Sequence, residues 1–332
     1  MVIRLQAASA CRRFDQERVR SLGSAGKPVD SATHQEDVLV KHTWWIGLLS
    51  WLVYSTGAWA QVQPDSRGQE ERQRLDSLYI NEIEERKQPD KVLHAEPLYI
   101  DLIRDLGARK GERELNVGVG LTDNLRYDTY QALVEYEWAP ADRIGMEVEL
   151  PFSFYTRNEA GGPRPANQLE SLKAALQWSF FVSQQHQTTL ALGYIHELRL
   201  GGSREPLLQG NKFNPFLIAA KRWGDRLHTL LYLGPQVKQS FRETGRKTNL
   251  QINTSLHYMI PGSRNFVGVE VNKERTGRQL SVIARPQLRV SITDNLLVGI
   301  VTGIPVDKRT ERLSSFLRLI YEPGHRSHSR LD

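Results

Sequence analysis

The sequence predicts an all-β fold, a closed antiparallel transmembrane β-barrel of about twelve strands that follows a short helical periplasmic segment. Three observations carry this prediction. Many segments alternate between apolar and polar residues. Most of them have about ten residues or more, and membrane-spanning strands need ~9–11 whereas ordinary globular strands have ~5–6. The connections alternate between tight and longer, which is typical of outer-membrane barrels with short periplasmic turns.

The composition is compatible with such a barrel. The chain has 332 residues, of which 39% are hydrophobic, and its mean hydropathy is −0.47. A barrel gives the same values as a soluble protein because its strands alternate. The formal charge of +6 comes from interspersed residues and not from a basic arm, so we expect no nucleic-acid partner. The only cysteine, Cys11, excludes internal disulfides and cysteine-cluster metal sites, and we expect no metal and no cofactor.

The one long apolar run occupies residues 43–61 and reads TWWIGLLSWLVYSTGAWAQ. A short basic flank precedes its apolar core, and the small-x-small motif of Ala58 and Ala60 comes directly before Gln61. This order is typical of a secretory signal peptide. We therefore predict a signal over residues 38–60 that is cleaved before Gln61. The alternative is an uncleaved anchor, but the polar sequence that follows has no basic stop-transfer cluster.

Residues 1–37 have no sustained helical or strand period. Since a signal peptide begins at the N-terminus of its protein, this stretch is predicted to be a mis-annotated extension or a disordered segment. Translation would then begin near Val38 or Val40. A genuine cytoplasmic tail is the alternative.

Residues 61–112 are predicted to be a helical periplasmic lead-in or a plug that enters the barrel. A charged helix fits residues 66–88, with a narrow apolar stripe and a proline directly after it. A second short helix fits EPLYIDLIRDLG at residues 96–107, where Pro97 stands near the start and Gly107 at the end.

Residues 113–322 are predicted to form the barrel, and residues 323–332 a polar tail. In YQALVEYEW, for example, Tyr130, Val134 and Tyr136 share one face of a strand while glutamates occupy the other. The twelve predicted strands are 113–121, 128–139, 143–155, 168–183, 187–201, 213–223, 227–241, 246–260, 264–273, 277–292, 295–306 and 311–322. Aromatic residues near strand ends fit interfacial girdles; they are Tyr127, Trp138, Tyr155, Trp178, Trp223 and Tyr321.

The polar strand faces carry charges that are unequally distributed around the predicted barrel. The acidic residues are expected to face the basic ones across the lumen, and such a transverse field would orient and select polar solutes in a narrow pore. The alternative is that these groups pair and fill a closed interior. The predicted lumen residues are Glu135, Glu137, Glu147, Glu149, Arg285, Arg289 and Arg318.

The predicted external loops are basic. They could hold the phosphates of an outer leaflet that includes anionic lipopolysaccharide through charge-assisted hydrogen bonds, or they could be simply solvated. The candidates for lipid-phosphate contact are Arg242, Arg246, Lys247, Lys273, Arg275 and Arg278. A barrel of this kind also implies the barrel-assembly machinery as a partner.

Three stretches carry a resemblance to a known family. They are HAEPLYIDLIRDLGARKGERELNVGVGLTDN at residues 94–124, ALVEYEWAPADRIGMEVELPF, and ITDNLLVGIVTGIPV. The region 94–322 resembles a family of Gram-negative outer-membrane barrels that is loosely similar to those named for the MetA pathway of phenol degradation. The resemblance implies the fold and the location but no substrate. Such barrels usually end on an aromatic residue, whereas here Tyr321 is followed by EPGHRSHSRLD.

The sequence therefore predicts a passive channel for small solutes or hydrophobic compounds, without catalysis and in the outer membrane. The alternatives are a lipid-modifying enzyme and a structural barrel with a plugged lumen. An enzyme needs a nucleophile within hydrogen-bond reach of a base. Asn253, Ser255 and His257 share a strand face, but residues i and i+2 of a strand lie about 6.5–7 Å apart, which is too far for a direct bond.

Overall fold

The computed structural model describes residues 66–84, 88–100, 106–157, 163–201, 207–242, 244–309 and 311–323. The chain divides into the units Met1–Pro64 and Asp65–Asp332, and all described residues belong to the second unit. The predicted extension, signal peptide and cleavage site lie outside the described residues, as does most of the polar tail. Among the residues that are described, no helix combines the length and apolar character needed to cross a membrane.

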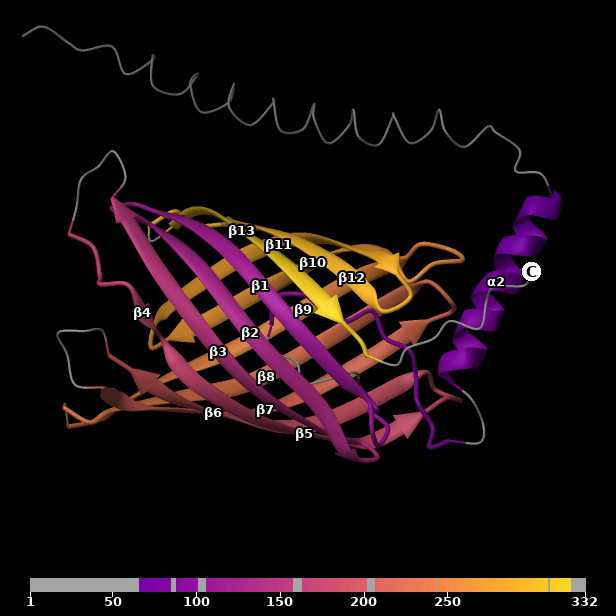
Figure 1. The fold of residues 1–332 in the computed structure, drawn as a ribbon, viewed down its shortest axis with the longest axis horizontal. Coiled ribbons are helices and arrows are strands. Elements are labelled where there is room, and N and C mark those ends of the chain that lie inside the picture. The colour runs from indigo at the N-terminus through magenta and orange to yellow at the C-terminus, as the bar shows by residue number, and fades with distance from the viewer. Residues whose placement is uncertain are drawn as a thin grey trace, which may run out of the picture. The chain divides into compact units, whose positions relative to one another are not determined.

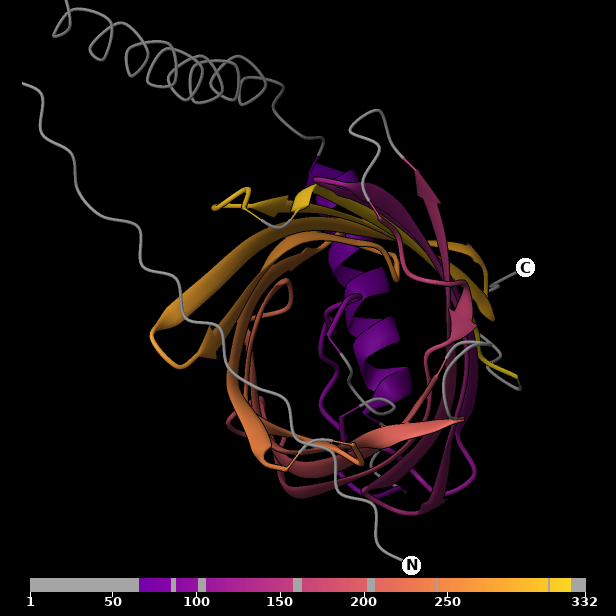
Figure 2. The same ribbon diagram turned by 90° about the vertical axis from the view of Figure 1, so that its left-hand side faces the viewer.

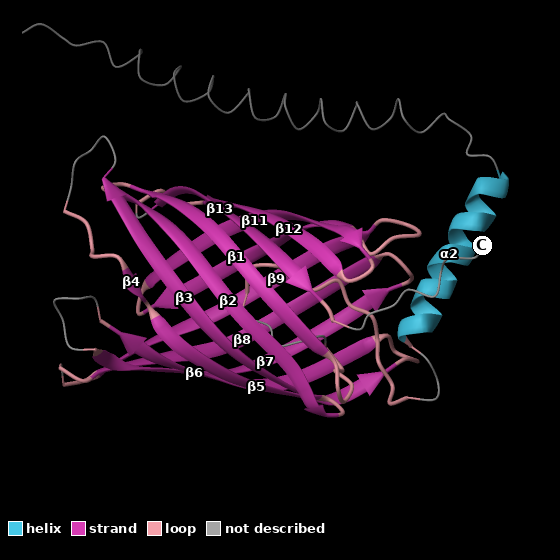
Figure 3. Ribbon diagram, viewed as in Figure 1, coloured by secondary structure: helices cyan, strands magenta, loops and turns pink. Residues whose placement is uncertain are grey.

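Helix α2 comes first in the described chain, and thirteen strands follow (Figures 1 and 3). The elements are α2 (Ser66–Ile83), β1 (Arg113–Asn124), β2 (Tyr127–Ala141), β3 (Ile144–Arg157), β4 (Gln168–Leu169), β5 (Ser171–Ser183), β6 (Thr188–Leu200), β7 (Leu208–Trp223), β8 (Leu227–Ser240), β9 (Arg246–Met259), β10 (Phe266–Thr276), β11 (Gln279–Thr293), β12 (Leu296–Pro305) and β13 (Glu311–Tyr321). The last strand ends at Tyr321, so the sequence EPGHRSHSRLD follows the final strand and is not part of it.

The sheet is antiparallel and closed, which confirms the predicted fold class. Each strand pairs with its sequence neighbour, and β13 pairs with β1 to close the ring. Strands β4 and β5 are separated only by Glu170 and both pair with β3, so together they occupy the position of one strand in the barrel wall. The thirteen strands therefore occupy twelve positions in the barrel wall.

The two ends of the barrel differ. One end, called the plug end after the plug described below, carries the connections β2–β3, β5–β6, β7–β8, β9–β10 and β11–β12. Helix α2 contacts this end through the bond from Gly262 N–H to Asp76. The other end, called the open end here, carries the remaining connections, at the left of Figure 1.

The predicted sorting of loop lengths is only partly correct. At the open end β1 and β10 run to Asn124 and Thr276, so the connections to the next strands have two residues each, 125–126 and 277–278. At the plug end the β9–β10 connection has six residues, 260–265. The reason is that ladder pairing continues beyond the apolar–polar pattern, as at Thr276↔Gln279.

Side chains alternate between the two faces of the wall as predicted. Large apolar side chains on the outer face are exposed, for example Val119 at 50%, Trp178 at 52% and Leu192 at 48%. Polar side chains on the inner face are buried, for example Glu149 and Glu270 at 1% and 0% exposure. An apolar exterior around a polar interior is the arrangement of barrels that sit in a lipid bilayer.

Residues 88–100 and 106–109 form a plug inside the barrel, visible as the purple trace within the ring of strands in Figure 2. The helix predicted for residues 96–107 is wrong at residues 98–100, which form a bend. Helix α2 also ends at Ile83, earlier than predicted. At Leu106 and Gly107, which form a turn, the backbone N–H groups bond to the side chains of Glu96 and Ser179 in place of the backbone carbonyls that a helix would offer.

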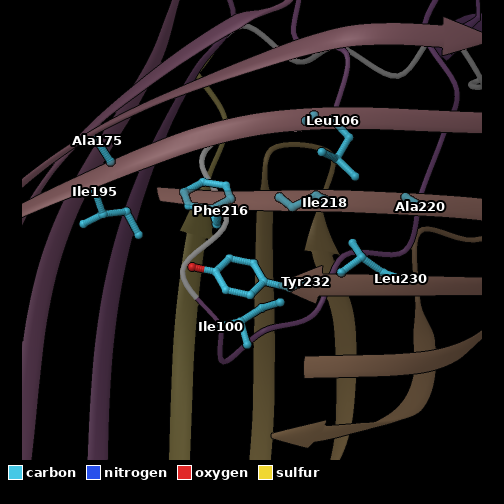
Figure 4. Close-up of a cluster of buried hydrophobic side chains, with 10 residues drawn as sticks. Ile100, Leu106, Ala175, Ile195, Phe216, Ile218, Ala220, Leu230 and Tyr232 are labelled. Atoms are coloured by element: carbon cyan, nitrogen blue, oxygen red, sulfur yellow. The ribbon is translucent and has the colours of Figure 1, made fainter. Parts of the chain in front are cut away.

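The inner face is less polar than the sequence pattern predicted, because part of it packs against the plug. Ile100 and Leu106 of the plug contact inward-facing apolar side chains of β5 to β8 (Figure 4). These wall residues are Ala175, Ala191, Ile195, Phe216, Ile218, Ala220, Leu230 and Tyr232. A second cluster combines Ala95 and Leu98 of the plug with Met259, Phe266, Leu297, Val301, Phe316 and Ile320. The plug is therefore packed in the lumen on two sides.

Gly193 makes room for the Phe216 ring of the first cluster. It lies opposite Phe216 in the β6–β7 register, and a Cβ on Gly193 would lie 2.0 Å from Phe216 Cζ. We expect Gly193→Val to cost about 1–3 kcal/mol of folding free energy, because the ring must leave its stack on Tyr232. Denaturant unfolding in detergent would measure this. The lipid-facing control Leu192→Val should change stability by less than about 0.5 kcal/mol, and equal effects would contradict the packing argument.

Candidate functional site

The plug is held by side chains that point into the lumen from several strands. His228 Nδ1 on β8 accepts a hydrogen bond from the backbone N–H of Ala95 at 2.9 Å. Gln287 Oε1 on β11 accepts one from Leu98 N–H at 2.7 Å. Because a backbone N–H is always a donor, the bonded His228 must present an unprotonated Nδ1. The wall thus satisfies two N–H groups that a helix beginning near Pro97 would leave without an intrahelical acceptor.

The tip of the plug reaches the middle of the lumen. The carboxylate of Glu270 on β10 is hydrogen-bonded by the backbone of Tyr99 and Ile100. The Arg285 guanidinium lies 3.3 Å from the centroid of the Tyr99 ring, and Phe316 packs edge-on against the same ring with a centroid distance of 6.0 Å. Tyr99 is therefore fixed from three strands.

The plug is closed on itself and anchored at both ends. Glu96 Oε1 accepts a bond from Leu106 N–H at 2.7 Å, and Ser179 Oγ accepts one from Gly107 N–H at 2.9 Å. At the plug end, Arg222 forms a 2.7 Å ion pair with Glu84, which also accepts a bond from Leu93 N–H. The plug is a specifically bonded element and not a loosely packed chain.

The four predicted lumen glutamates gather on one wall. Glu135 and Glu137 of β2 lie opposite Glu149 and Glu147 of β3 in the ladder, and all four are 1–2% exposed. Asn116 of β1 donates to Glu135 at 2.6 Å and to Glu137 at 2.9 Å. Directly opposed like charges destabilise a sheet, so this wall requires cations.

Arg318 is one of these cations, which corrects the prediction that it faces the acids across the lumen. Because the barrel is closed, β13 lies next to β1, and Arg318 Nη2 reaches Glu135 Oε2 at 3.4 Å from the same side. Lys173 of β5 supplies a second cation through a 2.9 Å pair with Glu149. Carboxylate oxygens of Glu135, Glu147 and Glu149 lie within 4.8 Å of one another, but with Arg318 and Lys173 in place we assign no metal there.

The other two predicted basic residues lie on β11. Arg285 is 3% exposed, contacts Tyr99 as described, and donates to Asn272 at 2.7 Å and to Ser314 at 3.2 Å. Arg289 lies nearer the plug end, where its guanidinium is 4.6 Å from the Phe266 ring centroid and donates to the carbonyl of Arg264. The predicted residues thus form an acidic wall with its own cations and two separate arginines.

A cavity of about 400 Å³ lies between the plug tip and the open end. Its floor includes Tyr99 and Ile100 of the plug together with Tyr232 and Phe316 of the wall. Amide and charged side chains surround it, namely Gln131, Gln236, Gln251, Asn253, Asn272, Glu149, Glu170, Glu274, Glu311, Lys173, Lys212, Lys273, Arg285 and Arg318. It is the candidate site for a solute.

The predicted lipid-contact residues gather at the open end of β8 to β11. Five of them are exposed, namely Arg242, Arg246, Lys247, Arg275 and Arg278. Lys273 is half-buried and donates to Thr254 Oγ1 at 3.1 Å, so it is held against the wall and also borders the cavity.

The residues of the enzyme alternative point into the lumen. Ser255 and His257 of β9 are 7% and 1% exposed, and His257 Nε2 is 2.9 Å from Gln287 Nε2, not from a serine. No hydrogen bond joins Ser255 and His257 among the described residues, which gives the catalytic reading no support.

The sequence prediction missed the residues that hold the plug. His228, Glu270 and Gln287 all lie at inward positions of predicted strands. Polar side chains at such positions were the available signal, but their partner is a segment far away in the sequence, and strand periodicity gives no information about that contact.

Comparison with known proteins identifies relatives of this chain. The HAEPLYID-like family matches residues 90–322, and the letters HAEPLYID occur here at residues 94–101, in the plug region. This description differs from the phenol-degradation barrels that the sequence resembles loosely. No curated protein matches the chain.

Two solved structures illustrate the structural likeness. The COG4313 outer membrane channel from Pseudomonas putida F1 is 12% identical, with a TM-score of 0.51 over 67% of this chain and 99% of that one. The KdgM porin is 13% identical, with a TM-score of 0.44 over 63% of this chain and 98% of that one. The first likeness agrees with the barrel fold described above.

Proposed function

Because this chain belongs to the HAEPLYID-like family and folds as a closed barrel, we propose that it is a passive outer-membrane channel for small solutes, without catalysis. The observation that carries the proposal is the cavity of about 400 Å³ within a barrel whose exterior is apolar. Export by a signal cleaved before Gln61, insertion by the barrel-assembly machinery, and contact of the basic open-end residues with anionic lipopolysaccharide belong to the same proposal.

The plug determines how such a channel works. It separates the cavity from the plug end, so solute passage requires the plug to move. The bonds to His228, Gln287, Glu270 and Ser179 each contribute about 0.5–1.5 kcal/mol net, or more where the partner is charged. Displacement must also break the packing of Leu98 and Ile100 in the two apolar clusters, and in this proposal it is a reversible step that leaves the wall intact.

The experiment that tests the function is fractionation followed by single-channel recording. We expect the protein in outer membranes, a gel-mobility shift on boiling, and infrequent current steps in planar bilayers. A soluble protein without a shift would overturn the barrel's location. If wild type and the plug-displacing variants all show the gel-mobility shift on boiling but no current, a structural protein with a plugged lumen would be favoured.

Gly299 of β12 gives a means of displacing the plug without deleting it. A Cβ on Gly299 would lie 2.8 Å from Leu98 Cδ2, so Leu98 fits over this glycine. We expect Gly299→Leu to force Leu98 away and to raise the open probability about tenfold, since it opposes both packing and the Gln287 bond. Val298→Leu adds the same side chain on the outer face of β12 and serves as the control. Equal open probabilities in the two variants would contradict this role of Leu98.

A further inference from the structure

Two buried amides border the cavity without a protein partner. Gln236 of β8 and Asn253 of β9 are 7% and 4% exposed, and neither side chain bonds to another described residue. An amide carries two donors and an acceptor, and buried polar groups are almost always hydrogen-bonded. The cavity contents, water or solute, must therefore both accept from and donate to these groups.

Other amides extend this arrangement around the cavity. Gln131 of β2, Gln251 of β9 and Asn272 of β10 also line it. Asn272 already joins Glu270 to Arg285, with bonds of 2.5 and 2.7 Å. A hydroxyl group is both donor and acceptor, as an amide is, so hydroxyls match this lining.

Each charged side chain of the lining has a neighbouring protein group as its partner, and most of these partners carry the opposite charge. Arg285 interacts electrostatically with Glu270 and Glu311. The ion pairs are Lys173 with Glu149 at 2.9 Å, Arg318 with Glu135 at 3.4 Å, and Lys212 with Glu197. The other three charged groups bond to neutral side chains, namely Glu274 to Asn249 at 2.6 Å, Glu170 to the Tyr155 hydroxyl at 2.7 Å and Lys273 to Thr254 at 3.1 Å. A charged solute would have to disrupt such pairs, whereas a neutral solute would not.

The floor of the cavity is aromatic. Tyr99 and Phe316 meet edge to face, and Tyr232 stacks on Phe216 with a centroid distance of 5.0 Å. Aromatic groups beneath a rim of polar groups suit a ligand that has an apolar face and polar edges. A sugar ring has this shape, with C–H groups on its faces and hydroxyls around its rim.

We propose that this cavity binds a neutral polyhydroxylated solute of monosaccharide or disaccharide size. The proposal rests on the channel function and names the substrate class of the same lumen. Its volume of about 400 Å³ lies within the range of ~300–1,000 Å³ common for ligand pockets. Gln236 and Asn253 bond the hydroxyls, and the aromatic floor contacts the C–H groups of the sugar.

The test is equilibrium binding to the full chain in a detergent without a sugar headgroup, measured by saturation-transfer NMR. The probes are methyl α-glucoside, gluconate and glucosamine. We expect the neutral glucoside to bind most tightly. Gln236→Ala combined with Asn253→Ala should weaken its binding about tenfold, as expected for the loss of two hydrogen bonds. Asn295→Ala, in the β11–β12 turn at the plug end, is the matched amide control and should have no effect.

The mobility shift on boiling shows that each variant is folded. A single substitution, Asn253→Asp, keeps the side-chain size and should shift the preference toward glucosamine, because it adds a negative charge. Tighter binding of gluconate, or binding that the double variant leaves unchanged, overturns the inference. If Gly299→Leu conducts ions but the glucoside does not bind, the channel stands and the substrate class is wrong. If the glucoside binds but no variant conducts, the channel function is wrong.

Discussion

Replacing Arg318 with methionine is expected to destabilise the folded barrel by about 3–5 kcal/mol, because the substitution leaves buried acids without their cation. The Arg318 side chain is 9% exposed and the Glu135 side chain 2%. Glu137, Glu147 and Glu149 lie in the same wall and are equally buried. Removing one partner of a buried ion pair costs far more than the pair itself contributes, since the remaining charge has lost its hydration.

A pair on the same strand provides the control for this experiment. Arg312 of β13 pairs with Asp123 at 3.1 Å, but both side chains are more than 40% exposed. Arg312→Met should therefore cost less than about 1 kcal/mol. The measurement is the denaturant midpoint of unfolding in detergent for both variants. Glu135→Gln should restore part of the stability lost in Arg318→Met, and similar midpoints for the Arg318 and Arg312 variants would refute the argument.

The position of Arg318 shows how far sequence reasoning reached. The alternation of residues predicted both the strands and the inward direction of this side chain. Closure of the ring then places the last strand beside the first, so that Arg318 reaches Glu135 from two strands away, past β1, and not across the lumen. The prediction of a closed barrel contained this information, but the expected transverse field treated the chain ends as far apart.

The plug could not be derived in the same way. Leu98, Leu102 and Leu106 have helical spacing, and a helix is the usual solution for an amphipathic segment in water. Inside the barrel, side chains take the place of helix carbonyls, since Glu96 and Ser179 accept from the N–H groups of Leu106 and Gly107. The inward apolar residues Phe216 and Ile218 interrupt the polar lining because they pack against the plug. The sequence of the strand does not reveal this contact.

Deleting residues 93–105 is expected to convert the barrel into an open pore. The Lys91 side chain lies 3.6 Å from the Cβ position of Gly107, so a short glycine-serine linker can rejoin the chain at the plug end. The deletion removes Leu98, Tyr99 and Ile100 from the lumen but none of the ladder bonds of the wall. The wall should therefore remain closed while the obstruction disappears.

In planar bilayers we expect this variant to conduct continuously, with a mean current about tenfold or more above that of wild type, because a twelve-strand barrel encloses more space than its own side chains fill. Ser77→Ala on α2 removes only the exposed bond to the Gln73 carbonyl and should leave the current unchanged. The mobility shift on boiling again shows that the variant is folded. A folded variant with wild-type current would place the obstruction in the wall's own side chains, around the paired glutamates and Arg318. In that case the plug would act in stability and not in closing the pore.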